Sequence, residues 1–168
     1  MYIPLKIIKA ETKGIKWAIE AMRLPKQSVG DSNFKSGFIG PKDKQLATNL
    51  IKSGDDHAKA MRGIIVWMKI ELQVGFMIEF ETYRHGVEVL STTSSMHNEL
   101  KSLRGSALAA QKQKDLITKV YIRSLHMSYQ ALKNIYHARR HHKHPDWQIF
   151  CNWIETLPYA NTLITLKD

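Results

Sequence analysis

The amino-acid sequence predicts an α+β fold, in which a mostly antiparallel sheet is flanked by helices and one long helix lies at the centre. Three observations support this class. Residues 64–72 form a run of β-branched and aromatic side chains that is typical of a strand. Residues 12–23 repeat apolar side chains at helical spacing. Residues 107–142 contain neither proline nor glycine, which favours a single long helix.

The first half of the chain predicts one strand, two helices and a long loop. Residues 2–9 are rich in β-branched side chains and indicate a short first strand, which the helix at residues 12–23 follows. Residues 25–40 are rich in glycine, and a loop of this length in a compact domain is usually functional or mobile. Pro41 and Gly54 then bound a second helix.

The middle of the sequence predicts a helix with one strand before it and one strand after it. Asp55 or Asp56 caps a short helix just before the strand at residues 64–72. Residues 74–84 indicate the next helix, and residues 87–92 a further strand. We therefore expect strand, helix and strand to follow one another closely here.

The last third predicts the long helix and a shorter amphipathic one. A break near Ser124 or Ser128 is an alternative to one continuous helix over residues 107–142. Pro145 opens the final helix, and residues from Tyr159 onward indicate a small strand. The final helix carries apolar side chains that we expect in the core or in contacts between subunits, namely Trp147, Phe150, Cys151, Trp153 and Ile154.

Length and composition indicate one domain over residues 1–168, able to bury a core without disulfides or metal. Cys151 is the only cysteine, which excludes an internal disulfide and favours a reducing cytoplasm. No apolar run approaches the roughly 20 residues that a membrane-spanning helix needs, so we expect no membrane partner. A buried Cys151 with no histidine partner is expected to be inert.

The formal net charge of +10 favours phosphorylated or polyanionic partners. A nucleotide and a nucleic acid both satisfy this description. The basic residues are dispersed along the chain, which argues against a dedicated nucleic-acid arm. A lysine-rich surface that serves only solubility is the alternative.

Several cationic and hydroxyl side chains gather within about forty residues, separated by one strand and one helix. His57 precedes the strand, Arg84 and His85 follow the helix, and a hydroxyl-rich run occupies residues 91–95. Such groups suit an anionic ligand. For Arg84 the alternative is a surface charge at a helix end, and for the hydroxyl run it is a polar loop.

The order of these parts resembles the flavin-dependent thymidylate synthase (ThyX) family. That family has a histidine before a core strand, then a helix running into Arg-His-Arg-x-x-Ser-x-Asn-Glu-x-Ser-x-Arg-Tyr. Its C-terminal half has Arg-x-Leu-x-x-Phe-x-x-x-Arg followed by Gln-Trp-Glu-Ile-Arg, where this chain has residues 130–139 and 146–150. The similarity covers residues 45–155. Thr82-Tyr83-x-x-Gly86 and Ser95-Met96-His97 also resemble a smaller group of phage-borne relatives, which would give the cytoplasm of the host cell as the location.

The resemblance implies transfer of a one-carbon group to a pyrimidine deoxynucleotide with reduced FAD, using NADPH and folate. It also implies a homotetramer with sites at subunit interfaces. It assigns no catalytic side chain and no metal ligand. The residues it implies for the cofactor are His57, Arg84 and His85, and those for the substrate are Ser94, Ser95, His97, Gln130 and Arg139.

Some of the motif's arginines are replaced. Gly86 stands at the third motif position, and Gln130 and Phe150 stand where the C-terminal half of the family has arginine. The Asn98-Glu99 pair lies seven residues late. Each lost charged hydrogen bond to phosphate weakens binding by about 1.5–3 kcal/mol. The alternative function is therefore a catalytically lapsed ThyX-fold protein that binds nucleotide or nucleic acid through its basic surface.

A second cluster contains four histidines between residues 137 and 144. His137 and His141 have the i, i+4 spacing of zinc ligands, but no HExxH motif accompanies them. Arg139 and Arg140 lie beside these histidines, so the sequence favours a basic helix end that contacts phosphate over a zinc site.

Overall fold

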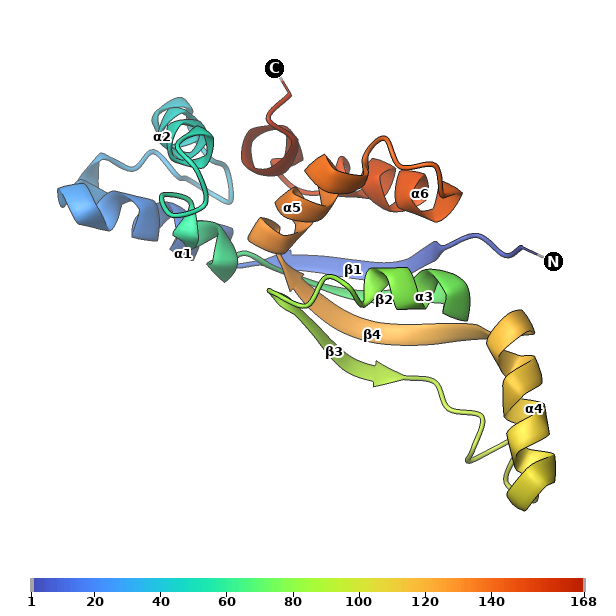
Figure 1. Ribbon diagram of the computed structural model, residues 1–168. Coiled ribbons are helices and arrows are strands. Elements are labelled where there is room, and N and C mark those ends of the chain that lie inside the picture. Colours follow the sequence, from blue (N-terminus) through green and yellow to red (C-terminus); the bar gives the residue numbers. More distant parts are fainter. Residues whose placement is uncertain (1, 168) are drawn as a thin grey trace.

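A four-stranded antiparallel sheet forms the centre of the protein, in a computed structural model that describes residues 2–167 without the side chains of residues 117 and 118. The strand order is β1-β2-β4-β3 (Figure 1). The strands are β1 (Lys6–Lys13), β2 (Ile65–Gln73), β3 (Val87–Thr92) and β4 (Val120–Ser128).

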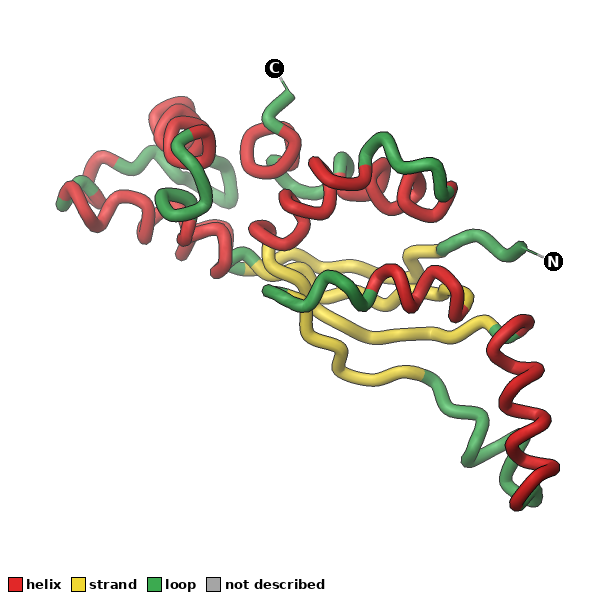
Figure 2. The backbone as a smooth tube through the Cα atoms, viewed as in Figure 1, coloured by secondary structure: helices red, strands yellow, loops and turns green. Residues whose placement is uncertain are grey.

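Alternation along β2 divides the sheet into a covered and an open face. Val66, Met68, Ile70 and Leu72 are buried, whereas Trp67 between them is half-exposed. Side chains of successive strand residues point to opposite faces, so the buried set marks the covered face. Helices α5 (Tyr129–Arg139) and α6 (Pro145–Ile154) lie above the sheet in Figures 1 and 2.

Aromatic side chains from α3 (Val74–Phe80) and α6 (Pro145–Ile154) build the core over that face. Trp147 packs edge-on against Phe76, with ring centroids 4.8 Å apart, and stacks on Phe80 at 5.8 Å. Its indole nitrogen donates to Glu79 at 2.9 Å, so the one polar atom of the ring is satisfied. α5 (Tyr129–Arg139) lies beside α6 and completes this layer.

α1 (Ile15–Arg23) and α2 (Pro41–Lys52) pack at the other end of the molecule. Asp43 at the start of α2 is buried and accepts hydrogen bonds from Arg23 Nε at 2.6 Å, Ser32 Oγ at 2.9 Å and the Asn33 amide at 3.0 Å. The loop between the two helices is therefore held by one carboxylate.

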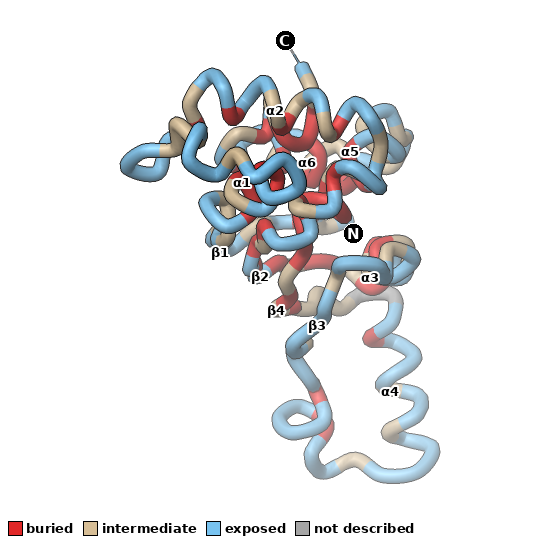
Figure 3. The backbone as a smooth tube through the Cα atoms, turned by 90° about the vertical axis from the view of Figure 1, so that its left-hand side faces the viewer, coloured by how far each residue is buried: buried red, intermediate tan, exposed pale blue. Residues whose placement is uncertain are grey.

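α4 (Gly105–Thr118) and the segment before it form an arm that projects from the β3–β4 end of the sheet. Most described residues of the arm are exposed (Figure 3). Leu100 and Ser95 are buried within it.

The predicted α+β class and antiparallel sheet are confirmed, and β3 has the predicted bounds. The predicted long helix is wrong, because residues 107–142 contain α4, the inner strand β4 and α5. β4 hydrogen-bonds to β2 on one side and to β3 on the other, and this pairing overrides the helical spacing of its apolar residues.

Smaller corrections concern the two ends of the chain and the turn before β2. The first strand occupies residues 6–13 rather than 2–9, and a helical turn at residues 161–165 replaces the predicted last strand. The predicted short helix after Asp55 is a 3-10 turn at residues 59–63. Among the described residues, no helix is long and apolar enough to cross a membrane.

Candidate functional site

A pocket of about 470 Å³ lies where three strands meet the first turn of α5; we call it the α5 pocket. Strands β2, β3 and β4, the turn before β3 and the segment before β2 all contribute to it. Its lining consists of Asp55, Arg62, Ile65, His85, Gly86, Glu88, His126, Ser128, Gln130, Ala131 and Asn134.

Ser128 is the last residue of β4, directly precedes α5 and lines this pocket. Its amide donates to the Gly86 carbonyl at 2.8 Å, and its Oγ accepts from the Ala131 amide at 3.1 Å. The second contact is an N-cap, which fixes where α5 begins. The positive end of the helix dipole therefore adjoins the pocket, and Arg62 adds a full positive charge.

Gly86 fits the α5 pocket because it has no side chain. Its φ of 72° lies in the left-handed region, and an added Cβ would lie 2.5 Å from Ser128 Oγ. Any larger residue would strain the backbone and collide with the capping hydroxyl. The backbone at this position therefore suits glycine and not arginine, which stands at the corresponding place in the ThyX motif.

Two side chains of the α5 pocket have buried polar atoms without partners. Gln130 is only 7% exposed, and its Oε1 accepts no hydrogen bond from the described residues. Its Nε2 donates to Asn134 at 3.3 Å. His126 Nδ1 is likewise unpaired within residues 2–167. Each such atom costs about 1–3 kcal/mol, a penalty that a ligand's polar groups could relieve.

Carboxylates balance part of the positive charge in the α5 pocket. Asp55 accepts a 2.6 Å hydrogen bond from Lys133, which lowers the pKa of that carboxyl group. Glu88 is the register partner of His126 across β3 and β4. The pocket therefore offers both anion-binding and proton-accepting groups to a ligand.

Of the residues implied by the resemblance, His85 and Gln130 meet in the α5 pocket. Arg84 instead lines a separate pocket of about 300 Å³ with Arg123. His57 is exposed in the turn before β2, where its amide donates to the Gly54 carbonyl at 3.1 Å.

The other implied substrate residues have local partners. Ser94 Oγ accepts from the Met96 amide at 3.2 Å, and the buried Ser95 accepts from the Leu100 amide through its carbonyl at 2.9 Å. His97 lines a pocket on the arm with Lys101 and Arg104 among others. Arg139 donates from Nε to the Tyr83 hydroxyl at 2.7 Å, on the core side of α5.

His126, Ser128 and Asn134 line the α5 pocket and were not among the predicted site residues. His126 and Ser128 lie on β4, which the sequence had assigned to a helix. The β-rich run Val120-Tyr121-Ile122 was the signal that could have located this strand. Asp55 and Arg62 also line the pocket without having been assigned to it.

The histidines between residues 137 and 144 make local contacts. His137 Nε2 lies 3.0 Å from the Ile164 carbonyl oxygen, and His142 Nδ1 accepts from the His144 amide at 3.1 Å. His144 Nδ1 accepts from the Asp146 amide at 3.2 Å and caps α6. Within the described part of the chain, no three side chains of histidine, cysteine, aspartate or glutamate gather as a metal site.

The fold is that of the flavin-dependent thymidylate synthases. A crystal structure of ThyX from Helicobacter pylori with FAD and dUMP matches with a TM-score of 0.64 and 16% identity, over 97% of this chain and 98% of that chain. A second ThyX structure from the same organism, also with FAD and dUMP, matches with a TM-score of 0.67 and 17% identity, over 99% and 100%.

No protein-family model matches the chain, and no curated protein matches it in sequence. The resemblance inferred from the sequence motifs is confirmed at the level of the fold. Identities of 16% and 17% are consistent with a divergent relative.

Proposed function

We propose that this protein binds a phosphorylated pyrimidine deoxynucleotide in the α5 pocket. The observation that carries the proposal is that buried, unpaired polar atoms of Gln130 and His126 adjoin a pocket that also has Arg62 and the start of α5. Arg62, His85 and the first amides of α5 suit a phosphate, and the side-chain oxygen of Gln130 suits the N–H of a pyrimidine. A volume of about 470 Å³ lies within the usual range for small-ligand sites.

On this scaffold the reaction we propose is a thymidylate synthase-like transfer of a one-carbon group with reduced FAD. The FAD-bound ThyX neighbours support it. When bound, the flavin would supply the hydride. NADPH as reductant and a folate as one-carbon donor would complete the set of reactants. The chain's own residues would bind and orient the nucleotide.

We also propose self-association into a homotetramer. The ThyX resemblance of the sequence supports this proposal, because it implies a homotetramer with sites at the subunit interfaces. Light scattering should then give a mass of four 19.4 kDa chains. A particle of 19.4 kDa at micromolar concentration would contradict the assembly.

The second candidate is a catalytically lapsed protein that binds a nucleotide or nucleic acid through its basic surface. Gln130 and Gly86 favour it, because both stand where the ThyX motifs have arginine. The net charge of +10 adds general attraction to polyanions.

Calorimetric titration with dUMP tests the binding. We expect Arg62→Gln to weaken dUMP binding by at least about tenfold, the loss of one charged hydrogen bond. Arg104→Gln on the arm is the matched control and should leave the affinity unchanged, since Arg104 lies outside the α5 pocket. Failure of the unaltered protein to bind dUMP would contradict nucleotide binding in both candidates.

Turnover separates the two candidates. Protein supplied with FAD, NADPH, methylene folate and dUMP should form a methylated nucleotide, detected by mass spectrometry. Binding of dUMP without turnover would support the lapsed binder, as would retention on DNA that falls steeply with added salt.

A further inference from the structure

Strand β3 separates the α5 pocket from the pocket of about 300 Å³ that contains Arg84 and Arg123; we call the latter the arginine pocket. Val87 and Val89 of β3 line the arginine pocket, whereas Glu88 between them lines the α5 pocket. Successive strand residues point to opposite faces, so the two pockets lie on opposite sides of this strand. The rest of the lining comes from α3, the turn after it and β4, namely Phe80, Glu81, Tyr83, Arg84 and Arg123.

Arg123 brings a buried guanidinium group to the arginine pocket. The residue is only 6% exposed. Its Nε donates to the Thr92 hydroxyl at 3.0 Å, and its Nη2 lies 2.8 Å from a carboxylate oxygen of Glu81. Its Nη1 is buried and has no hydrogen-bond partner among the described residues. The N–H groups of that nitrogen carry a penalty that an anionic ligand in the pocket would remove.

Arg84 adds a second cation to the arginine pocket. It is exposed, and it forms no ion pair with any residue that the structure describes. The Val87 amide donates to the Arg84 carbonyl at 3.4 Å and closes the turn that positions it. Glu81 is the one carboxylate among the described lining residues, so two cations stand against one anion. A ligand with a single negative charge would balance this pocket.

Apolar and aromatic side chains form the remaining walls of the arginine pocket. Phe80 is buried, Tyr83 is half-buried and Val89 is 47% exposed. The Tyr83 hydroxyl accepts a 2.7 Å hydrogen bond from Arg139, which fixes the position of its ring. Apolar walls with a few charged groups are the usual composition of small-molecule sites. The walls suit a ligand whose anionic group is attached to an apolar body.

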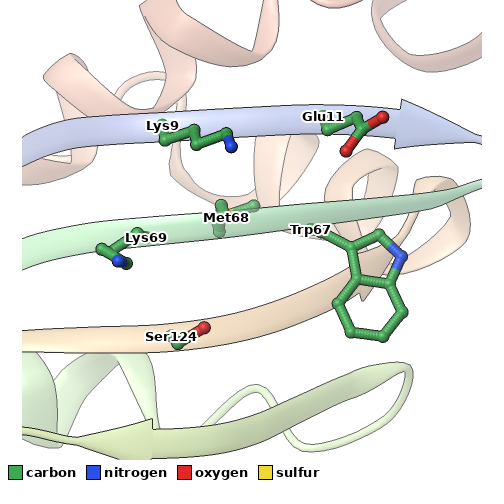
Figure 4. A pocket seen from close by; sticks show the side chains of 6 residues that line it. All are labelled: Lys9, Glu11, Trp67, Met68, Lys69 and Ser124. Carbon is green, nitrogen blue, oxygen red and sulfur yellow. The ribbon is translucent and has the colours of Figure 1, made fainter.

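The pocket of about 230 Å³ on the open face of the sheet lacks this combination. Figure 4 shows Lys9, Lys69 and Glu11 in its lining. Both lysines are exposed, and Glu11 is already paired with Lys13 at 2.6 Å. None of the buried, unpaired polar atoms found in the described residues belongs to that lining. Positive charge on the open face is therefore solvated, whereas Arg123 is held out of water.

We propose that the arginine pocket is a second ligand site, which takes a small carboxylate with an apolar body. The carboxylate accepts hydrogen bonds from Arg123 Nη1 and from Arg84, and the body packs against Tyr83 and Val89. A diphosphate brings more negative charge than this pocket balances, so Arg84 serves the carboxylate here and not the cofactor for which the resemblance implies it. The inference does not rest on the proposed function, because the nucleotide lies in the α5 pocket on the other side of β3.

Titration of the full chain with benzoate, followed by ligand-observed NMR, tests the site. Benzoate joins one carboxylate to a planar apolar ring. We expect saturable binding at millimolar benzoate, no binding of benzyl alcohol, which lacks the charge, and weaker binding of acetate, which lacks the ring. Tighter binding of phenyl phosphate than of benzoate would overturn the choice of a carboxylate. Displacement of bound benzoate by FAD would overturn it too and would identify the pocket as part of a cofactor site.

Two substitutions at exposed positions locate the binding. Arg84→Gln should weaken benzoate binding at least about tenfold, as for the loss of one charged hydrogen bond. Val89→Phe should weaken it as well, because the larger side chain fills the pocket. Arg104→Gln on the arm is the matched control and should leave the benzoate affinity unchanged. All three variants should bind dUMP as the unaltered chain does, since none of these residues lines the α5 pocket.

The results for the two ligands separate the two proposals. Benzoate affinity that stayed the same in Arg84→Gln and Val89→Phe would overturn the second site and leave the nucleotide site intact. Absence of saturable benzoate binding in a chain that binds dUMP would do the same. Binding of benzoate without dUMP would contradict the nucleotide site alone. Arg123→Gln removes the buried group together with its ion pair to Glu81, so the test depends on the two exposed positions.

Discussion

Arg139 Nε donates a 2.7 Å hydrogen bond to the hydroxyl oxygen of Tyr83, joining the end of α5 to the turn after α3. The guanidinium carbon also lies 5.0 Å from the ring centroid of Trp147 and 5.5 Å from that of Tyr83. The side chain of Arg139 therefore connects α5 with the turn after α3 and with α6. The ThyX resemblance implies substrate binding by Arg139, and these contacts add a structural role.

Replacing Arg139 by glutamine should destabilise the protein. The change removes a hydrogen bond and two cation–π contacts, which together contribute about 1–3 kcal/mol. Urea unfolding monitored by circular dichroism measures the loss. Tyr83→Phe removes the hydrogen bond but keeps a ring, so its effect should be smaller. Unchanged unfolding together with weaker dUMP binding in Arg139→Gln would favour the substrate role instead.

Replacing Gly86 by alanine should damage both the fold and the α5 pocket. The new Cβ would lie 2.5 Å from Ser128 Oγ, at a φ of 72° that side chains rarely adopt. We expect a loss of about 1–3 kcal/mol in the free energy of unfolding, from the strained backbone and the disturbed N-cap.

Gly75→Ala is the matched control for that experiment. Gly75 lies in α3, and no atom lies within 4 Å of an added Cβ. Alanine should therefore stabilise that helix by up to about 1 kcal/mol. Equal effects of the two substitutions in urea unfolding would show that the approach to Ser128 does not matter. Adding Ser128→Gly to Gly86→Ala should relieve the clash but not the backbone strain.

The sequence predicted elements with clear end signals and missed those without them. β3 was found with its observed bounds because Gly86 precedes a β-rich run. β4 was missed because neither proline nor glycine separates it from α4 or α5. Its strand conformation depends on ladders to β2 and β3, which are distant in sequence. Local spacing cannot report such pairing.

Contacts between segments that are distant in sequence also limit what could be predicted of the site. His85 and Gln130 were implied through motif positions and do line one pocket. His126 and Ser128 face it only because β4 is a strand. The close approach of Gly86 to Ser128 joins two segments about forty residues apart and has no signature in either segment alone.

Replacing Asp43 by asparagine should strongly destabilise the end of the protein that contains α1 and α2. The carboxylate and Arg23 are both buried, and their contact at 2.6 Å is supported by Ser32 and Asn33. Removing one charge leaves Arg23 buried without its partner, a loss of about 3–5 kcal/mol. Hydrogen exchange should also increase across residues 24–40.

Asp31→Asn is the control for Asp43, because Asp31 is an exposed aspartate in the loop that Asp43 holds. It should change the free energy of unfolding by less than about 0.5 kcal/mol. If Asp43→Asn were equally mild, the loop would have to be held by contacts other than this ion pair.

Cys151 should make stability fall at alkaline pH. Burial raises the pKa of its thiol from 9.0 to about 11. The folded state thus holds the proton more tightly than the unfolded chain, so the thiol's contribution is complete below about pH 9 and is lost as pH rises toward 11. Each unit of difference corresponds to about 1.4 kcal/mol, which limits the effect to about 2–3 kcal/mol.

The comparison with Cys151→Ala isolates this effect, because all other titrating groups are common to both proteins. The difference in unfolding free energy between them should be constant from pH 7 to about 9 and shrink from there to about 11. The folded protein should also react with a disulfide reagent at pH 8 far more slowly than the unfolded chain, because the thiol is buried and protonated. A thiol that reacted equally fast in both states would mean that Cys151 is not buried in the folded protein, and the pH dependence should then vanish as well.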